Sequence, residues 1–269
     1  MSITNFHLSY GPHDFHGIRA GNGPALLVCL HGFGETAAHF EPLAEGLGHR
    51  FTIVSLDLPL HGGTLWAGNK PITKKDLKNI LTALLQQEGH DRFTLLGYSM
   101  GGAVALCAVE CMALQLDGLV LMAAAGLVKN PWHVFVTQTW LGNRIFRYQT
   151  YHPQIFFRLL IWARGMGWIN ESVYKFAYNR MDTEEKRLQV YEVWTIMRRM
   201  MPDLSRCRRE MKKYKIPLLQ IFGKYDRVIP PAFASRFENA TGFPVKTIVL
   251  EKGHQLINGS LGDIINTNL

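Results

Sequence analysis

The sequence has few cysteines and no long apolar segment. Its 269 residues include only four cysteines, none of them in a C-x-x-C pair, so a reduced, cytoplasmic protein is expected rather than a disulfide scaffold. The longest apolar stretches fall far short of the roughly 20 residues that a membrane-spanning helix needs. The first residues also lack the basic and apolar regions of a signal peptide. Neither a transmembrane helix nor secretion is therefore expected.

Two common cofactor motifs are also missing from the sequence. No H-E-x-x-H string and no G-x-G-x-x-G string occurs, so the sequence predicts neither a metal site nor a dinucleotide site, and no cofactor. Charged residues make up only 19% of the chain and hydrophobic residues 47%, a balance that excludes intrinsic disorder. The length fits one or two folded domains.

The net charge of +8 is concentrated in one segment. Residues 127–210 carry a surplus of seven positive charges, half of the chain's aromatic residues and five of its six tryptophans. A shift in composition of this size indicates an inserted subdomain or a domain boundary. We therefore expect a core domain formed by residues 1–126 and 211–269, with residues 127–210 as a separate insert.

Outside this insert, apolar runs alternate with segments of helical periodicity. Three runs lack the alternation of polar and apolar residues, which is typical of parallel strands that are covered on both faces. These runs are Ala25–Leu30, Phe51–Leu56 and residues 93–96. Three later runs predict further strands, at residues 118–123, 216–222 and 245–250. Thr73 and Asp76 resemble the start of a helix, and residues 232–239 a later one. The order of elements predicts an α/β fold with a mostly parallel sheet, and residues 1–20 read as a hairpin at its edge.

Ser99 lies in the string Gly97-Tyr98-Ser99-Met100-Gly101, directly after a predicted strand and before a predicted helix. This G-x-S-x-G pattern in that context is typical of a nucleophile elbow, in which the serine is exposed at the carboxyl end of the sheet. Glycine is needed at positions 97 and 101 because a Cβ there would collide with neighbouring backbone. The alternative is that the serine simply occupies a tight turn.

A serine nucleophile requires a base and an acidic residue that orients the base. Asp226 follows one late strand and His254 follows the next, so both side chains are expected at the same edge of the sheet as Ser99. The order serine, aspartate, histidine is the one that this kind of sheet requires. Taken singly, Asp226 would be an ordinary turn residue and His254 a surface residue.

A tetrahedral oxyanion needs two N–H donors. Met100, next to the nucleophile, is expected to supply one, and Phe33 in the turn His31-Gly32-Phe33-Gly34 is expected to supply the second. His31 itself is expected to brace this turn by hydrogen bonding rather than to act as a base. Glu35 lies beside the turn, where it either influences pH dependence or starts the following helix.

Together these motifs resemble those of the α/β-hydrolase superfamily. The resemblance implies a mostly parallel, eight-stranded sheet flanked by helices, with residues 127–210 as a helical cap inserted after the sixth strand. Residues 57–62 resemble the D-x-P-G-H-G segment of the superfamily, with Leu60 in place of its usual glycine. In the superfamily the aspartate and histidine of this segment, here Asp57 and His61, are structural.

A serine at position 99 favours a carboxylesterase-like serine hydrolase that cleaves an ester or related acyl bond of a small, largely apolar substrate through an acyl-enzyme. The resemblance leaves three alternatives open. They are a C–C bond hydrolase, a lyase of the menaquinone-pathway type acting on an anionic substrate, and a hydrolase-like protein that binds a ligand without turnover.

The insert is expected to determine which substrate is bound. Trp140 and Trp162 are candidates for an apolar pocket, although tryptophans of a small helical subdomain also serve its own packing. The expected partner is then a small-molecule substrate and not a nucleic acid. The protein is expected to be a monomer or a homodimer. A basic, aromatic outer face of the insert would also suit peripheral contact with a membrane or lipid.

Overall fold

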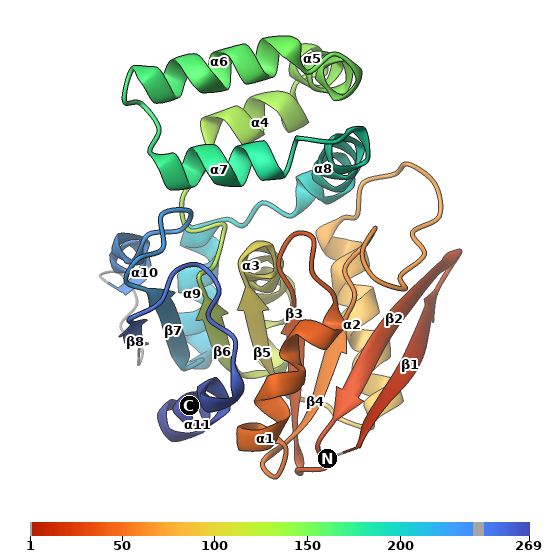
Figure 1. Ribbon diagram of the computed structural model, residues 1–269. Helices are drawn as coiled ribbons and strands as arrows, with labels where there is room; N and C mark the ends of the chain where they lie inside the picture. The colour runs from red at the N-terminus through yellow and green to blue at the C-terminus, as the bar shows by residue number, and fades with distance from the viewer. Residues whose placement is uncertain (1, 239–244) are drawn as a thin grey trace. The chain divides into compact units, whose positions relative to one another are not determined.

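The protein contains one eight-stranded sheet, which the computed structural model describes over residues 2–238 and 245–269 (Figure 1). The strand order is β1-β2-β4-β3-β5-β6-β7-β8. β1 pairs antiparallel with β2, and β2 with β4, whereas all other neighbouring strands are parallel. The strands are β1 (Ile3–Tyr10), β2 (His13–Ala20), β3 (Ala25–Leu30), β4 (Phe51–Leu56), β5 (Phe93–Tyr98), β6 (Leu116–Met122), β7 (Leu218–Gly223) and β8 (Val245–Leu250).

The continuous apolar runs form the central strands, as predicted. Every residue of β4, β5 and β7 is buried, because helices cover both faces of the sheet at these positions. The hairpin of β1 and β2 lies at the edge of the sheet, also as predicted.

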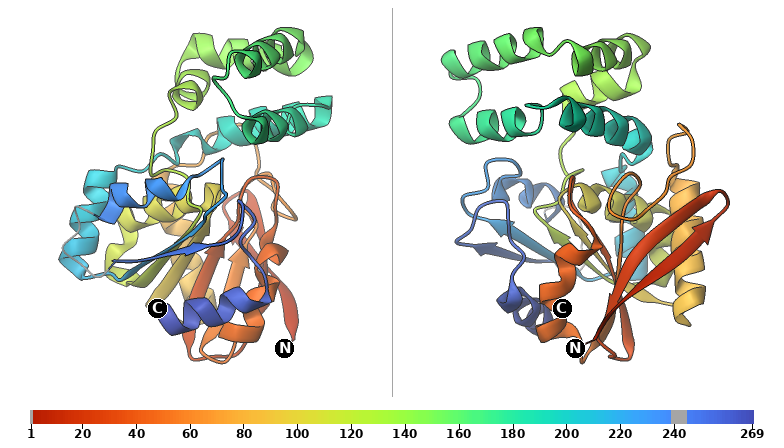
Figure 2. Two further views of the ribbon diagram at one scale, coloured as in Figure 1. Left: turned by 60° about the vertical axis from the view of Figure 1, so that its left-hand side comes forward. Right: turned by 45° about the vertical axis from the view of Figure 1, so that its right-hand side comes forward.

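Helices cover both faces of this sheet (Figure 2). α1 (Ala44–Leu47) and α11 (Gly259–Asn268) pack together on one face, and α2 (Lys74–Glu88), α3 (Met100–Met112) and α9 (Leu204–Tyr214) lie on the other. The other helical segments of this part of the chain are η1 (Ala37–Leu43), η2 (Ala113–Gln115), η4 (Pro231–Phe233) and α10 (Ser235–Glu238). The last two replace the single helix expected over 232–239, and residue 239 lies outside the described residues.

The helix predicted to start near Thr73 begins with a complete capping box. The Thr73 hydroxyl accepts a hydrogen bond from the N–H of Asp76 at 3.2 Å, and the Asp76 carboxylate accepts one from the N–H of Thr73 at 2.8 Å. The helix ends at Gly89, which has a φ of 71°. Its apolar face, from Leu77 to Leu85, is buried.

The chain divides into two compact units. The sheet unit comprises residues 1–68, 72–128 and 199–269, and the helical unit comprises residues 69–71 and 129–198. The helical unit follows β6 and contains α4 (Pro131–Gln138), α5 (Trp140–Tyr151), α6 (Gln154–Gly165), α7 (Glu171–Asn179) and α8 (Glu184–Ile196), and η3 (Met197–Arg199) follows α8.

The helical unit ends earlier in the chain than the segment expected from composition, residues 127–210. α9 belongs to the sheet unit because its apolar side packs on α3, where the Cys207 thiol lies 3.2 Å from the carbonyl oxygen of Leu106. Four of its basic residues, Arg206, Arg209, Lys212 and Lys213, are exposed, so composition alone groups the helix with the insert.

The helical unit has a small core of its own. Val136, Phe146, Val193 and Ile196 are buried in it, and Trp194 packs against Phe146 at a ring distance of 5.5 Å. Within the described residues, no helix is long and apolar enough to cross a bilayer.

Candidate active site

Ser99 occupies the sharp turn between β5 and α3. Its backbone has a φ of 48°, a conformation that residues other than glycine rarely adopt. Three backbone hydrogen bonds hold it there. The N–H of Ser99 donates to the carbonyl oxygen of Met122 at 3.0 Å, and the carbonyl oxygen of Ser99 accepts from the N–H groups of Gly102 and Ala125 at 2.9 and 2.8 Å. The strained turn is therefore fixed by its surroundings.

The two glycines of the motif are required by close backbone approach, as predicted. A Cβ on Gly101 would lie 2.0 Å from the carbonyl oxygen of Leu30, and a Cβ on Gly97 would lie 2.6 Å from that of Gly101. Side chains at these positions would push α3 away from the sheet. Glycine therefore lets the helix start directly at the nucleophile.

The structure brings Ser99, His254 and Asp226 together in a hydrogen-bonded row. His254 Nε2 lies 3.1 Å from Ser99 Oγ, and His254 Nδ1 lies 2.7 Å from Asp226 Oδ2. Asp226 is 2% exposed, and its other oxygen accepts hydrogen bonds from the N–H groups of Val228 and Ile229 at 2.8 and 2.9 Å. The carboxylate only accepts, so Nδ1 carries the proton and Nε2 is left to accept from the serine hydroxyl.

Tyr98 holds the loop that carries His254. Its hydroxyl donates to the His254 carbonyl oxygen at 3.1 Å, and the two rings lie 5.5 Å apart. Tyr98 is itself 1% exposed and immediately precedes the nucleophile. One side chain thus fixes the distance between the serine turn and the histidine loop.

The turn His31-Gly32-Phe33-Gly34 lies directly against the nucleophile. A Cβ on Gly32 would be 3.2 Å from the Cβ of Ser99. Phe33 packs edge-on against the His61 ring at 5.7 Å, and the N–H of Gly34 donates to His61 Nε2 at 3.0 Å. Met100 is the first residue of α3, where backbone N–H groups lack partners within the helix. The assignment of Phe33 and Met100 as oxyanion donors stays a prediction.

His31 braces this turn, as predicted, and is fully buried. Its Nδ1 donates to the carbonyl oxygen of Gly32 at 2.7 Å, and its Nε2 accepts from the N–H of Leu58 at 2.9 Å. Burial, followed by the neighbouring His61, lowers the pKa of His31 to about 4. The ring is therefore neutral at physiological pH.

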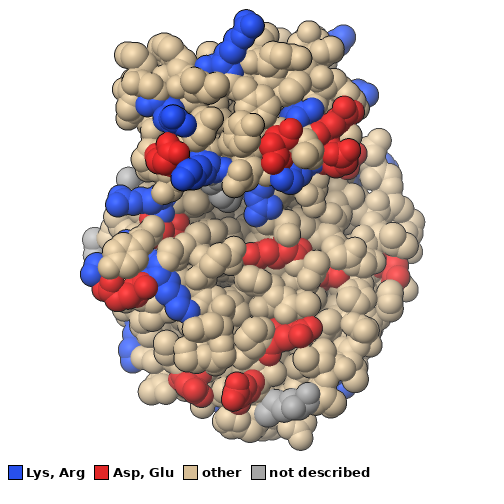
Figure 3. Space-filling view, in the orientation of Figure 1, with Lys and Arg blue, Asp and Glu red and all other residues tan. Residues whose placement is uncertain are grey.

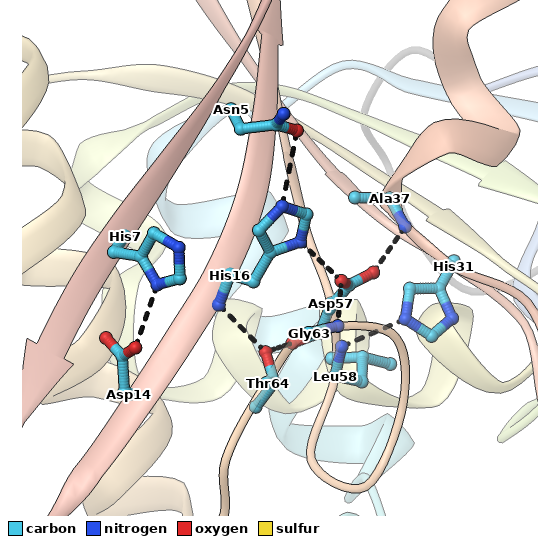
Figure 4. Close-up of polar contacts among 10 residues, drawn as sticks. All are labelled: Asn5, His7, Asp14, His16, His31, Ala37, Asp57, Leu58, Gly63 and Thr64. Carbon is cyan, nitrogen blue, oxygen red and sulfur yellow. Dashed lines mark hydrogen bonds and ion pairs between the residues drawn. The ribbon is translucent and has the colours of Figure 1, made fainter.

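Asp57 anchors the neighbouring loop (Figure 4) and is 1% exposed. One oxygen accepts from the N–H of Ala37 at 2.6 Å, and the other from Gly63 at 2.9 Å and from His16 Nδ1 at 2.7 Å. The Thr64 hydroxyl donates to the Asp57 carbonyl oxygen at 2.7 Å. All of these contacts are within the scaffold, which agrees with a structural role. Leu60, at the position of the expected glycine, has a φ of 65°.

Glu35 connects the loops on either side of the nucleophile. It accepts hydrogen bonds from the N–H of Gly32 at 3.2 Å and from Gln255 Nε2 at 3.4 Å, next to His254 in the chain. His39 lies 3.5 Å from the same carboxylate and stacks on Tyr98 at 5.2 Å. Burial lowers the pKa of His39, whereas Glu35 acts to raise it. Sequence reasoning missed His39, for which the four-residue spacing from Glu35 is the only signal.

Trp140 and Trp162 lie in the helical unit and are 75% and 51% exposed. Their assignment to a substrate pocket stays a prediction. Within residues 2–238 and 245–269, no group of three or more histidine, cysteine, aspartate or glutamate residues is arranged to hold a metal ion.

Comparison with known proteins identifies relatives along nearly the whole chain. The sequence model described as "Alpha/beta hydrolase family" matches residues 27–262. The uncharacterised hydrolase YugF of Bacillus subtilis (strain 168) is 25% identical over 253 residues, which cover 90% of each chain. A pimeloyl-[acyl-carrier protein] methyl ester esterase of Aeromonas hydrophila is 24% identical, over 87% of this chain and 89% of its own. Among solved structures, 2-hydroxy-6-oxo-6-phenylhexa-2,4-dienoate hydrolase from Rhodococcus sp. strain RHA1 shares the fold, with a TM-score of 0.64 and 20% identity, over 99% of this chain and 96% of its own.

Proposed function

Because this chain belongs to the alpha/beta hydrolase family, we propose that it cleaves a carboxylic ester, or a related acyl bond, of a small and largely apolar molecule through an acyl-enzyme on Ser99. The observation that carries the proposal is the row of hydrogen bonds from Asp226 through His254 to Ser99. The methyl ester esterase among its relatives supports the choice of an ester.

In the proposed first step, His254 Nε2 accepts the hydroxyl proton while Ser99 Oγ forms a bond to the carbonyl carbon. The carbonyl π electrons move to the oxygen, and the N–H groups of Phe33 and Met100 hold the resulting oxyanion. Asp226 keeps its proton-free form and stabilises the imidazolium. When the tetrahedral intermediate collapses, the bond to the alcohol oxygen breaks and His254 gives its proton to the leaving alcohol.

The second step repeats these roles with water. His254 takes a proton from the water as its oxygen attacks the acyl carbon, and a second oxyanion forms in the same position. Its collapse breaks the bond to Ser99 Oγ, which regains the proton from His254. The products are a carboxylic acid and the unchanged enzyme.

The test is hydrolysis of p-nitrophenyl esters from acetate to palmitate by wild-type protein and by Ser99→Ala. We expect one preferred chain length, and a fall in kcat of at least about 10⁴-fold in the variant, because the nucleophile is removed while the fold is kept. Ser9→Ala, at an exposed position of β1, is the matched control and should keep wild-type rates.

Unchanged turnover in Ser99→Ala would contradict the proposal. If the wild-type protein cleaves no ester, labelling by a fluorophosphonate probe separates the alternatives. A labelled Ser99 would favour cleavage of another bond, such as a C–C bond, because the serine is then activated. An unlabelled Ser99 would favour a protein that only binds its ligand.

A further inference from the structure

The first half of the helical unit carries positive charge without any carboxylate. Between Asp117 and Glu171 the chain has no acidic residue and five basic ones, Lys129, Arg144, Arg147, Arg158 and Arg164. The acidic residues of the unit lie in or beside α7 and α8. In Figure 3 the surface over α5 and α6 is accordingly blue and tan, while red gathers over α7 and α8. The unit is therefore polarised, and α5 and α6 form its cationic side.

α6 has apolar side chains on two opposite faces. Phe156, Phe157 and Leu160 are half-buried, and Phe157 packs against Tyr178 of α7 at a ring distance of 5.2 Å. No residue of the helix is fully buried. The inward face thus accounts for the packing of α6 within the unit and leaves its other apolar residues unexplained.

The second apolar face of α6 is a stripe in which residues recur at intervals of four, three and four. Ile155, Leu159, Trp162 and Met166, just beyond the end of α6, are 53%, 58%, 51% and 56% exposed. This spacing places them one above the other along the helix. A helix that served only the packing of the unit would carry polar residues there.

α5 also has exposed apolar side chains, and one of its arginines lies beside them. Trp140, Leu141 and Tyr148 are 75%, 55% and 56% exposed, and the Arg144 guanidinium lies 5.4 Å from the centre of the Trp140 ring. The exposed apolar side chains therefore alternate with arginines on both helices.

We propose that this surface docks the protein onto a membrane rich in anionic phospholipid. We define the basic aromatic face by Arg144, Tyr148, Arg158, Leu159, Trp162 and Met166. Tryptophan and tyrosine side chains sit at the level of the lipid headgroups, and leucine and methionine bury apolar area at the acyl boundary. The arginines are attracted to anionic headgroups, and no neighbouring carboxylate in α5 or α6 opposes them.

A second copy of the chain is a poorer occupant of this face. In a symmetric dimer the same patch meets itself, so the arginines of one copy would face those of the other with no acidic residue of α5 or α6 between them. Charge complementarity therefore selects an anionic surface.

The test is co-sedimentation with vesicles of phosphatidylcholine alone or mixed three to one with phosphatidylglycerol. We expect binding to the anionic vesicles that is at least tenfold stronger than to neutral ones and that weakens in 0.5 M salt. No substrate is present in this test, so its failure would not count against the proposed ester hydrolysis. Failure of the ester assay would likewise not count against membrane binding.

Two pairs of variants separate the apolar and charged contributions. Leu159→Ser with Met166→Ser should weaken vesicle binding about tenfold, whereas Leu114→Ser, at a leucine of the sheet unit that is 62% exposed, should not. Arg144→Gln with Arg158→Gln should weaken it about tenfold, whereas Lys75→Gln with Lys78→Gln on α2 removes the same charge and should have little effect. Circular dichroism checks that each variant is folded.

Two results would overturn the proposal. One is the absence of binding to anionic vesicles at low salt. The other is equal loss of binding in the lysine and arginine variants, because the attraction would then come from the net charge of the chain rather than from this face. Self-association that is abolished by Leu159→Ser, without vesicle binding, would assign the face to a second copy.

Discussion

Two residues near the active site hold a backbone conformation that is unfavourable for their side chains. Ser99 has a φ of 48° and Leu60 a φ of 65°. Strain of this kind costs on the order of 1–3 kcal/mol and persists only where the surroundings impose it. The motif around Ser99 predicts such a turn, whereas a leucine at position 60 gives no local signal for it, since leucine has no preference for positive φ. The resemblance to a glycine-containing segment is the only pointer in the sequence.

The sequence predicts the positions of the serine, aspartate and histidine because each lies within four residues after the end of a strand that is itself predicted from the sequence. The partners of Glu35 are a different case. Gly32 and His39 lie three residues before and four residues after Glu35, whereas Gln255 reaches the same carboxylate only after two distant segments have folded together. No spacing in the chain indicates this last contact. Contacts of this type require the structure.

His31 predicts a pH dependence of stability. Its folded-state pKa of about 4 lies below the ordinary value near 6.5, so above pH 6.5 it is neutral in both states. As the pH falls from 6.5 to 4, the unfolded chain binds a proton that the folded protein does not, and the free energy of unfolding decreases. Between pH 7 and pH 5 we expect this residue to account for a loss of about 2 kcal/mol, measured by urea unfolding.

The variant His31→Gln isolates this effect. Between pH 7 and pH 5 its free energy of unfolding should fall by about 2 kcal/mol less than that of the wild-type protein. His49→Gln, at an exposed position, should behave as the wild-type protein does. Equal losses in all three proteins would show that His31 is not the group responsible.

At the scale of helices and strands, a buried carboxylate joins three helices of the sheet unit. Glu110 of α3 is 5% exposed and accepts from Lys74 Nζ of α2 at 2.7 and 2.8 Å. The same carboxylate accepts from the N–H of Asp203, the residue that caps α9, at 2.8 Å. This contact fixes where the chain re-enters the sheet unit after the helical unit.

Glu110→Gln should lower the free energy of unfolding by about 1–3 kcal/mol, because it replaces the buried carboxylate that accepts from Lys74, whose side chain is 32% exposed, and from the N–H of Asp203. Denaturant unfolding measures this value. The matched control is Asp117→Asn, which removes a carboxylate from a pair with Arg92 in which both side chains are about half exposed. We expect it to cost less than about 1 kcal/mol, and a similar cost for both variants would argue against a special role of burial.

The strands of the sheet unit and the start of α2 are predicted to within a few residues because their signals are local. Continuous apolar runs give the strands, and the Thr73–Asp76 capping box gives the start of α2. The end of the helical unit was missed because α9 is highly charged on one side and packs on α3 with the other. Composition averages over both sides, so only three-dimensional packing separates α9 from the insert.

At the scale of the whole molecule, the four cysteines are free and distributed through packed helices and strands. Burial raises the pKa of all four thiols, that of Cys207 to about 12, and so suppresses the reactive thiolate. We expect the native protein at pH 8 to react with a disulfide reagent at least 100-fold more slowly than a free thiol. Colourimetric thiol titration measures this, with guanidinium-unfolded protein, which should titrate all four, as the control. A thiol that reacts within seconds in the native protein would contradict the expectation.

The uneven placement of tryptophan gives the molecule an intrinsic optical label. Trp132, Trp140, Trp162, Trp168 and Trp194 lie in the helical unit, and Trp66 is the one tryptophan of the sheet unit in the sequence. Fluorescence emission therefore reports chiefly on the helical unit, whereas far-ultraviolet circular dichroism reports on both. Melting curves recorded by the two signals will coincide if the units unfold together and separate if they do not. The two curves together thus measure how cooperatively the two units unfold, without any added probe.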